Sequence, residues 1–169
     1  MIKPRVFLIA SITADGFIAK NAEQFADWSS KEDKKLFVQL TKQAGVMVMG
    51  NTTYKLFPKP LPHRKHIVYT RDTTQNAPES VSFTNASPAQ LIKSLAQEGY
   101  EEIAIIGGQK IYDMFLQAGL IDELYLVVEP LLFGQGVQFT QSTMDQKMKL
   151  LESKNLNENT VMLHYEAVK

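Results

Sequence analysis

The sequence predicts an α/β protein with a mostly parallel central sheet, helices on both faces of the sheet and a C-terminal antiparallel hairpin. Three observations lead to this prediction. Short apolar runs rich in branched residues alternate with segments of helical periodicity. The runs are continuously apolar, which is typical of strands covered on both faces. Two strand-like runs then flank Asn157-Glu158-Asn159 near the end of the chain, the pattern of a hairpin.

The expected elements largely alternate between strand and helix, which implies right-handed crossovers. Buried strands are predicted at residues 6–10, 46–49, 66–69, 103–106 and 124–128. Helices are predicted at residues 31–44, 88–98 and 110–118. The hairpin strands are predicted at residues 149–156 and 160–168. Because the 169 residues contain no linker, repeat or low-complexity tract, we expect one domain spanning residues 1–169.

Composition excludes several kinds of chemistry. The chain has no cysteine, which rules out disulfides, thiolate metal sites and cysteine nucleophiles. Its three histidines (His63, His66 and His164) show no HExxH spacing, so we expect no catalytic metal. No apolar run exceeds five residues, whereas a membrane span needs about 20. We therefore expect a cytoplasmic protein without a membrane partner.

The formal net charge is zero, which argues against nucleic acid as a main partner. The charge is unevenly spread, since residues 1–85 carry 12 Lys and Arg against 7 acids and residues 86–169 carry 6 against 11. Five cations and no acid lie between Lys55 and Arg71. This basic stretch is either a solvated face or a pocket for a small phosphorylated ligand. Nucleic-acid binding through residues 55–71 is a weaker interpretation.

Ligands of open α/β sheets bind beyond the carboxyl ends of the strands, so the residues that follow each strand are candidates. Gly107-Gly108 follows one strand and opens a helix, which indicates either a tight turn or a close approach to phosphate. Gly50-Asn51-Thr52-Thr53 repeats this arrangement, with Thr52 or Thr53 as an N-cap or an anion ligand. Thr70-Arg71 ends another strand, where arginine suits a phosphate monoester or is a plain surface residue.

Ser29-Ser30-Lys31-Glu32-Asp33 begins the first helix and fits a capping box, either Ser29 with Glu32 or Ser30 with Asp33. Asp33 lies three and four residues before Leu36 and Phe37, which places it on the apolar stripe. A carboxylate there is suited to proton exchange, or it simply favours the helix dipole. Trp28 precedes this helix as a pocket wall or a core anchor. Hydrolysis is poorly supported because no GxSxG elbow occurs.

Taken together, the motifs resemble the dihydrofolate reductase superfamily, most closely the branch related to the reductase domain of the bifunctional riboflavin-biosynthesis deaminase-reductase. The resemblance covers nearly the whole chain. Its first motifs are Ser-x-x-x-Asp-Gly (Ser11 to Gly16), Asp27-Trp28, Val48-Met49-Gly50-x-x-Thr53-Tyr54 and Leu61-Pro62-x-Arg64-Lys65. The later ones are Ile105-Ile106-Gly107-Gly108-x-x-Ile111-Tyr112-x-x-Phe115-Leu116, Asp122-Glu123-Leu124-x-Leu126, Pro130 and Gly134-x-Gly136-x-x-Phe139.

The resemblance implies a three-layer dihydrofolate-reductase-like fold, NADPH as hydride donor, a small-molecule substrate and a homodimer. It places the nicotinamide near Ala10 and Ile18. It assigns the pyrophosphate to Gly50, Asn51, Thr52 and Thr53, and the 2′-phosphate to Thr70 and Arg71. It places Gly107, Gly108, Gln109, Lys110, Ile111 and Tyr112 along the other side of the cofactor. It also implies a cis peptide bond between Gly107 and Gly108. It makes Asp33 the catalytic acid and gives substrate binding to Ser11, Trp28, Phe37 and Arg64.

Three residues depart from the folate-reductase pattern. Asn51 replaces the usual arginine, Val127 replaces the threonine that orients the acid, and Asp27 replaces a proline. The motifs from residue 122 onward look more like the riboflavin branch. We therefore expect an NADPH-dependent reductase of a dihydrofolate-like or 5-amino-6-(ribosylamino)uracil-phosphate-like substrate. The alternative hypothesis is a catalytically inactive nucleotide-binding module of the same fold.

Overall fold

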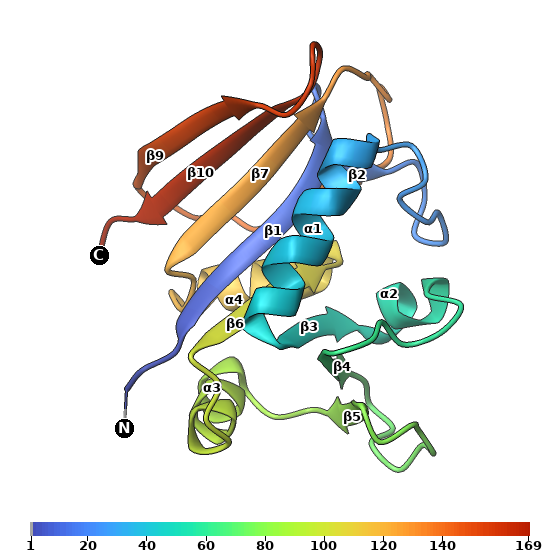
Figure 1. Cartoon of the computed structure of the whole chain (residues 1–169), viewed down its shortest axis with the longest axis vertical. Helices are drawn as coiled ribbons and strands as arrows, with labels where there is room; N and C mark the ends of the chain where they lie inside the picture. The colour runs from blue at the N-terminus through green and yellow to red at the C-terminus, as the bar shows by residue number, and fades with distance from the viewer. Residues whose placement is uncertain (1) are drawn as a thin grey trace.

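The computed structural model describes residues 2–169 and is built around an eight-stranded sheet with the strand order β5-β4-β3-β6-β1-β7-β10-β9. The first six strands of this order run parallel, and β10 and β9 add antiparallel pairings at one edge. The predicted mostly parallel sheet with a terminal antiparallel hairpin is therefore confirmed (Figure 1).

The strands of the large sheet are β1 (Arg5–Thr13), β3 (Val46–Gly50), β4 (Lys65–Tyr69), β5 (Val81–Thr84), β6 (Glu102–Gly107), β7 (Glu123–Glu129), β9 (Met148–Asn155) and β10 (Val161–Ala167). The helices are α1 (Lys31–Ala44), α2 (Asn51–Leu56), α3 (Pro88–Gln97) and α4 (Gln109–Gln117). Two short strands, β2 (Phe17–Ala19) and β8 (Val137–Gln138), pair with each other outside the main sheet.

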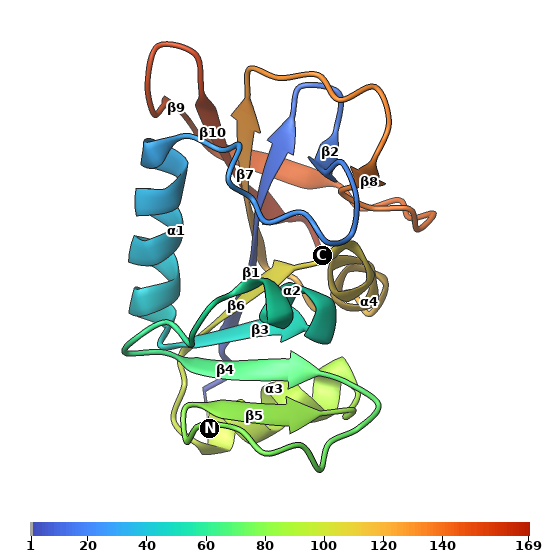
Figure 2. The same ribbon diagram turned by 90° about the vertical axis from the view of Figure 1, so that its right-hand side faces the viewer.

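Helices cover both faces of the sheet, which confirms the three-layer prediction (Figure 2). On one face, Leu95 of α3 and Phe115 of α4 pack with Leu8 and other apolar strand residues. On the other face, Leu40 of α1 packs with Met47 and its neighbours. Strand residues point alternately to the two faces, so a continuously apolar strand such as β3 fills both cores at once.

Four elements were absent from the sequence prediction: helix α2, strand β5 and the two short strands β2 and β8. Helix α2 has only six residues, too few to show a helical period, and its N-cap is Gly50 rather than Thr52 or Thr53. Strand β5 is the edge strand, and three of its four residues are only half-buried. Such a strand lacks the continuous apolar run by which its neighbours were predicted.

None of the helices within residues 2–169 is long and apolar enough to cross a membrane. The same residues contain no cluster of three or more His, Asp or Glu side chains that suits a metal ion.

Candidate active site

The site lies where the parallel strands end. In the sheet register Met49 pairs with Gly107, and Gly50 pairs with Tyr69, so the ends of β3, β4 and β6 are adjacent. Strand β1 lies on the other side of β6 and extends through Ser11 to Thr13. The residues that follow these strands therefore meet along one edge of the sheet, as the sequence predicted.

Asp33 is the most unusual polar residue at this edge, because its side chain is nearly inaccessible, with an exposed fraction of 4%. The Ser11 hydroxyl donates a hydrogen bond to Asp33 Oδ2 over 2.6 Å. Oδ1 is buried and has no hydrogen-bond partner in the described part of the chain. Burial raises the pKa of the Asp33 carboxyl, and the Ser11 and Ser29 side chains oppose that shift. The protonated form is thus favoured more than for an ordinary aspartate.

The start of α1 corrects the predicted capping box. Ser30 is the N-cap, and its hydroxyl accepts from the Asp33 backbone N–H over 3.2 Å, as the second alternative required. The return bond from Asp33 is missing. Instead Glu129, at the end of β7, accepts from the Ser30 backbone N–H over 2.8 Å and from the Ser30 hydroxyl over 2.7 Å. The Asp33 carboxylate is therefore left facing Ser11.

Glu129 is the main site residue that the sequence analysis missed. Its exposed fraction is 3%, and it also accepts from the Thr160 hydroxyl over 2.8 Å. From the sequence alone, a glutamate at the end of an apolar strand is expected to be exposed to solvent. The signal that could have found it is its place in β7, two residues after the buried Val127, which puts both side chains on one face.

Three glycines line the edge of the sheet closely. A Cβ on Gly50 would lie 3.2 Å from the Ile111 side chain. One on Gly107, whose φ is +122°, would lie 3.2 Å from the Tyr112 hydroxyl, and one on Gly108 would lie 3.3 Å from Thr53 Oγ1. The predicted cis peptide between Gly107 and Gly108 is present. The absence of side chains at these positions lets Ile111, Tyr112 and Thr53 pack closely against the backbone at the ends of β3 and β6.

The helix starts at this edge differ from the others. Helices α2 and α4 begin at Gly50 and Gly108 without a side-chain cap, whereas Ser30 caps α1 and Ser87 caps α3. Asn51 Oδ1 is buried without a partner in residues 2–169. The free backbone N–H groups at both uncapped starts are donors of the kind that phosphate oxygens accept from.

The remaining predicted cofactor residues surround the glycines. Thr70 is half-buried, Arg71 is exposed, and Arg71 forms no ion pair within residues 2–169. Gln109 donates to the Gln138 carbonyl over 2.9 Å, while Thr52 and Lys110 are exposed. Ile111 is buried beside Gly50, and Ile18 packs against the core cluster that contains Ala10.

Tyr112 is a structural anchor of the edge. Its hydroxyl lies 2.7 Å from the Ile9 carbonyl oxygen and 2.9 Å from that of Ile106, so it links the middle of β1 to the end of β6. Burial raises the pKa of this phenol, with a smaller contribution from the Asp33 charge. Tyr112 is therefore unsuited to proton exchange.

Arg64, to which the resemblance gives substrate binding, is buried. Its guanidinium donates to Thr41 Oγ1 over 2.9 Å and to the Pro62 carbonyl over 3.0 Å, with no carboxylate partner in the described residues. Burial lowers its pKa. His66 supports the same loop, since its Nε2 accepts from the Leu61 N–H over 3.1 Å and its Nδ1 lies 3.1 Å from the Arg64 carbonyl oxygen.

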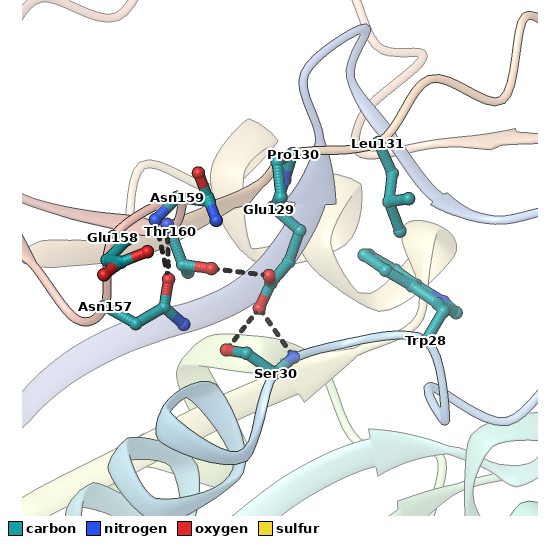
Figure 3. A pocket seen from close by; sticks show the side chains of 9 residues that line it. All are labelled: Trp28, Ser30, Glu129, Pro130, Leu131, Asn157, Glu158, Asn159 and Thr160. Carbon is teal, nitrogen blue, oxygen red and sulfur yellow. Dashed lines mark hydrogen bonds between the residues drawn. The ribbon is translucent and has the colours of Figure 1, made fainter.

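The aromatic residues predicted to bind substrate lie around α1. Phe37 is half-buried and packs against the α1-side core. Trp28 meets Phe133 edge to face, with ring centroids 5.3 Å apart. Trp28 also lines an open pocket of about 420 Å³ together with Ser30, Glu129, Pro130, Leu131 and the hairpin turn 157–160 (Figure 3). Trp28 and Ser30, the N-cap of α1, therefore both line this pocket.

The later sequence motifs have structural roles. Asp122 accepts from the Val6 backbone N–H over 2.9 Å, and Glu123 pairs with Arg5 over 2.7 Å, at the ends of β1 and β7 opposite to the site. Asp15 accepts from the Gly134 N–H over 2.7 Å. A Cβ on Gly136 would lie 2.3 Å from the Ala19 carbonyl oxygen, so glycine is needed where the chain enters β8 beside β2. These residues hold loops and strand ends rather than ligand.

Fold and site define a class of α/β proteins that take a ligand across the carboxyl edge of a parallel sheet. The family model described as Dihydrofolate reductase matches residues 5–162 of this chain. The chain therefore belongs to the dihydrofolate reductase family, which confirms the resemblance found in the sequence.

Curated relatives share the family at low identity. The uncharacterized protein YwjB of Bacillus subtilis (strain 168) is 26% identical over 170 residues, which cover 95% of this chain and 97% of YwjB. Dihydrofolate reductase type 9 of Escherichia coli is 29% identical over 143 residues, covering 82% of this chain and 79% of that protein.

Solved structures share the fold. The diaminohydroxyphosphoribosylaminopyrimidine deaminase/5-amino-6-(5-phosphoribosylamino)uracil reductase of Thermotoga maritima matches with a TM-score of 0.79 and 16% identity. The match covers 98% of this chain and 57% of that chain. At this identity the likeness establishes the fold alone.

Proposed function

We propose that the chain is a reductase that uses NADPH to reduce a small heterocyclic substrate, either a dihydrofolate-like pteridine or a ribosylamino-pyrimidine phosphate. The observation that carries this proposal is the position of Asp33. Its buried carboxyl has one oxygen held by Ser11 and one oxygen free, at the same sheet edge as the glycine-lined helix starts.

The residues at that edge fit a dinucleotide phosphate. The starts of α2 and α4 at Gly50 and Gly108 have no side-chain cap, so their backbone N–H groups can serve as donors for the pyrophosphate. Thr52 and Thr53 add hydroxyls beside those donors. The Arg71 guanidinium, free of any ion pair in residues 2–169, suits the 2′-phosphate that distinguishes NADPH from NADH.

When bound, NADPH supplies a hydride from its reduced nicotinamide ring. Ala10 and Ile18 would bound the nicotinamide region and keep water from it. Asp33 would pass a proton to the ring nitrogen of the substrate, a role favoured by burial, which raises the pKa of its carboxyl. Ser11 fixes the orientation of that carboxyl through the bond to Oδ2.

The substrate would lie between α1 and the loop that carries Trp28. Phe37 presents a half-buried aromatic surface on α1 for stacking a heterocycle. Arg64 is a buried cation that lacks a carboxylate partner among the described residues, and an anionic substrate group would compensate its charge. A carboxylate of a folate-like substrate and a phosphate of a pyrimidine substrate both meet this requirement.

The alternative is a nucleotide-binding module without turnover. Two observations favour it. Val127 is apolar where the family pattern has a threonine that orients the acid, and Asn51 stands in place of the phosphate-binding arginine. In this chain Ser11 supplies the hydroxyl that bonds to Asp33, so the loss at Val127 is compensated.

Calorimetric titration with NADPH and NADH separates these hypotheses when it is combined with turnover. We expect NADPH to bind at least about tenfold more tightly than NADH, a difference of about 1.4 kcal/mol. NADPH oxidation should then be assayed with dihydrofolate and with the ribosylamino-pyrimidine phosphate. Asp33→Asn should lower turnover at least about 100-fold and leave NADPH affinity nearly unchanged. Binding without turnover on either substrate would favour the inactive module, and absence of NADPH binding would contradict both.

A further inference from the structure

The backbone N–H of Ser30 has two carboxylates that could accept from it. In a capping box, the side chain of the third helical residue reaches back to the N–H of the N-cap residue. That third residue is Asp33, since Ser30 is the N-cap and α1 begins at Lys31. The bond is made by Glu129 instead, over 2.8 Å, from the end of another strand.

We propose that Glu129 is a positioning residue for Asp33: it occupies the capping position at Ser30 and so leaves the Asp33 carboxylate to Ser11 and the substrate. This inference rests on the proposed function only in giving Asp33 a role in catalysis. The displacement of Asp33 from the cap is a property of the chain itself.

One hydroxyl links the two acids. The Ser30 O–H donates to Glu129 Oε1 over 2.7 Å (Figure 3). Ser30 Oγ also accepts from the Asp33 backbone N–H over 3.2 Å. Because its single hydrogen is committed to Glu129, the lone pairs of Ser30 Oγ face the first turn of α1. Glu129 therefore orients the cap that begins the helix, and it leaves no free donor at Ser30 for Asp33.

Glu129 is well placed for this role because it is itself fixed. It lies opposite Thr13 in the β1–β7 register and accepts from Thr160 over 2.8 Å, at the start of β10. The turn between β9 and β10 holds the helix a second time, since Asn157 donates to Glu32 over 3.1 Å. No cation forms an ion pair with Glu129 within residues 2–169, so its charge is offset only by these hydrogen bonds.

The charged and titratable groups around Asp33 come from three elements. Glu129 faces it from β7, Tyr112 from α4, and Lys34 follows it on α1. The negative charge of Glu129 contributes to raising the pKa of Asp33, after the larger effect of burial. Loss of Glu129 would remove this negative charge. It would also free the Ser30 backbone N–H, which could then donate a hydrogen bond to the Asp33 carboxylate. Both changes lower the pKa of Asp33.

The test measures Asp33 directly, by ¹³C NMR titration of its carboxyl, and measures turnover separately. Glu129→Met keeps the side-chain length but removes both acceptor oxygens, and Glu129→Gln keeps one acceptor without the charge. Glu158→Gln is the matched control, because Glu158 lines the same pocket and forms no bond to α1. The peak of Asp33 is assigned from Asp33→Asn.

We expect Glu129→Met to lower the pKa of Asp33 and to lower turnover at least about tenfold. Glu129→Gln should lower that pKa less than Glu129→Met does, and its turnover should stay within about threefold of the original chain. Glu158→Gln should change neither the pKa of Asp33 nor turnover. In an Asp33→Asn background, Glu129→Met should change turnover less than about twofold, because both act through one carboxyl.

The proposal is overturned if the pKa of Asp33 is the same in Glu129→Met and in the original chain. It is also overturned if Glu129→Met lowers turnover by the same factor with and without Asp33→Asn. If Glu129→Met does not fold, Glu129→Asp replaces it, since this variant keeps the charge and withdraws the acceptor from Ser30. It should then lower both the pKa of Asp33 and turnover, and unchanged values overturn the proposal. Absence of turnover would contradict the proposed function. The NMR titration would still test the role of Glu129, because it measures the pKa of Asp33 and not turnover.

Discussion

A methyl group on Gly108 would lie 3.3 Å from Thr53 Oγ1, so the first residues of α2 and α4 approach each other across the edge of the sheet. The φ of Gly108 is −83°, which alanine adopts freely. Gly108→Ala should therefore fold, and should weaken NADPH binding about tenfold because its methyl group narrows the space at the helix starts. Calorimetric titration measures the affinity, and thermal unfolding confirms the fold.

A double variant identifies the cause of this effect. Thr53→Ala removes the hydroxyl that the new methyl group would meet. If Gly108→Ala acts by displacing ligand, its effect should persist in the Thr53→Ala background. Because Thr53 is itself a proposed phosphate ligand, the reference is Thr53→Ala alone. A double variant that binds NADPH as tightly as Thr53→Ala would contradict a ligand cradle and indicate a local clash between the two side chains.

Arg71 is expected to bind the 2′-phosphate of NADPH. Arg71→Ala should weaken NADPH binding at least about tenfold and leave NADH binding unchanged, because a charge-assisted contact to phosphate is lost. Lys59→Ala is the matched control, since it removes the same charge from the same basic stretch at an exposed position. Equal losses in both variants would mean that the stretch acts through its overall charge, and a loss of NADH affinity would place Arg71 elsewhere on the cofactor.

The sequence predicts the parts of this protein whose signal is local. Buried strands such as β3 are continuously apolar, and the glycines at 107 and 108 lie directly after an apolar run. The predicted position of Asp33 on the apolar stripe of α1 is confirmed, because helical spacing alone decides which face a residue shares.

The missed features depend on residues far apart in the chain. Glu129 and Ser30 lie 99 residues apart in the sequence, so no local sequence pattern predicts the hydrogen bond between them. The capping-box pattern was present in the sequence, yet a distant carboxylate completes the cap in place of the local one. The assignment of Arg64 to substrate stays a prediction, whereas its burial against Thr41 follows only from how α1 packs on the sheet.

Asp33 should make the folded state less stable as the pH rises. Its pKa in the folded protein is raised from 3.8, so between that value and the raised one the folded state binds more protons than the unfolded state. The free energy of unfolding therefore falls as the pH rises through this window and stays lower above it. Asp33→Asn removes this dependence, so it should gain stability relative to the original chain as the pH rises from 3.5 to 7. Urea unfolding across that range measures the difference, and a constant difference would contradict the burial of an ionisable carboxyl.

His66 should produce the opposite dependence. The side chain is fully buried and bonded at both nitrogens, and burial lowers its pKa from 6.5 in the folded state. Below pH 6.5 the unfolded chain takes up a proton that the folded chain does not. The contribution of His66 to the free energy of unfolding is thus complete above that pH and is lost as the pH falls toward the lowered pKa. His66→Gln keeps hydrogen-bonding groups in place without a titration in this range. It should lose about 1–3 kcal/mol of stability at pH 7, since a packed buried ring is replaced, and show a weaker loss between pH 7 and 5. Urea unfolding at pH 5, 6 and 7 measures both quantities, and an unchanged acid dependence in the variant would show that other groups cause it.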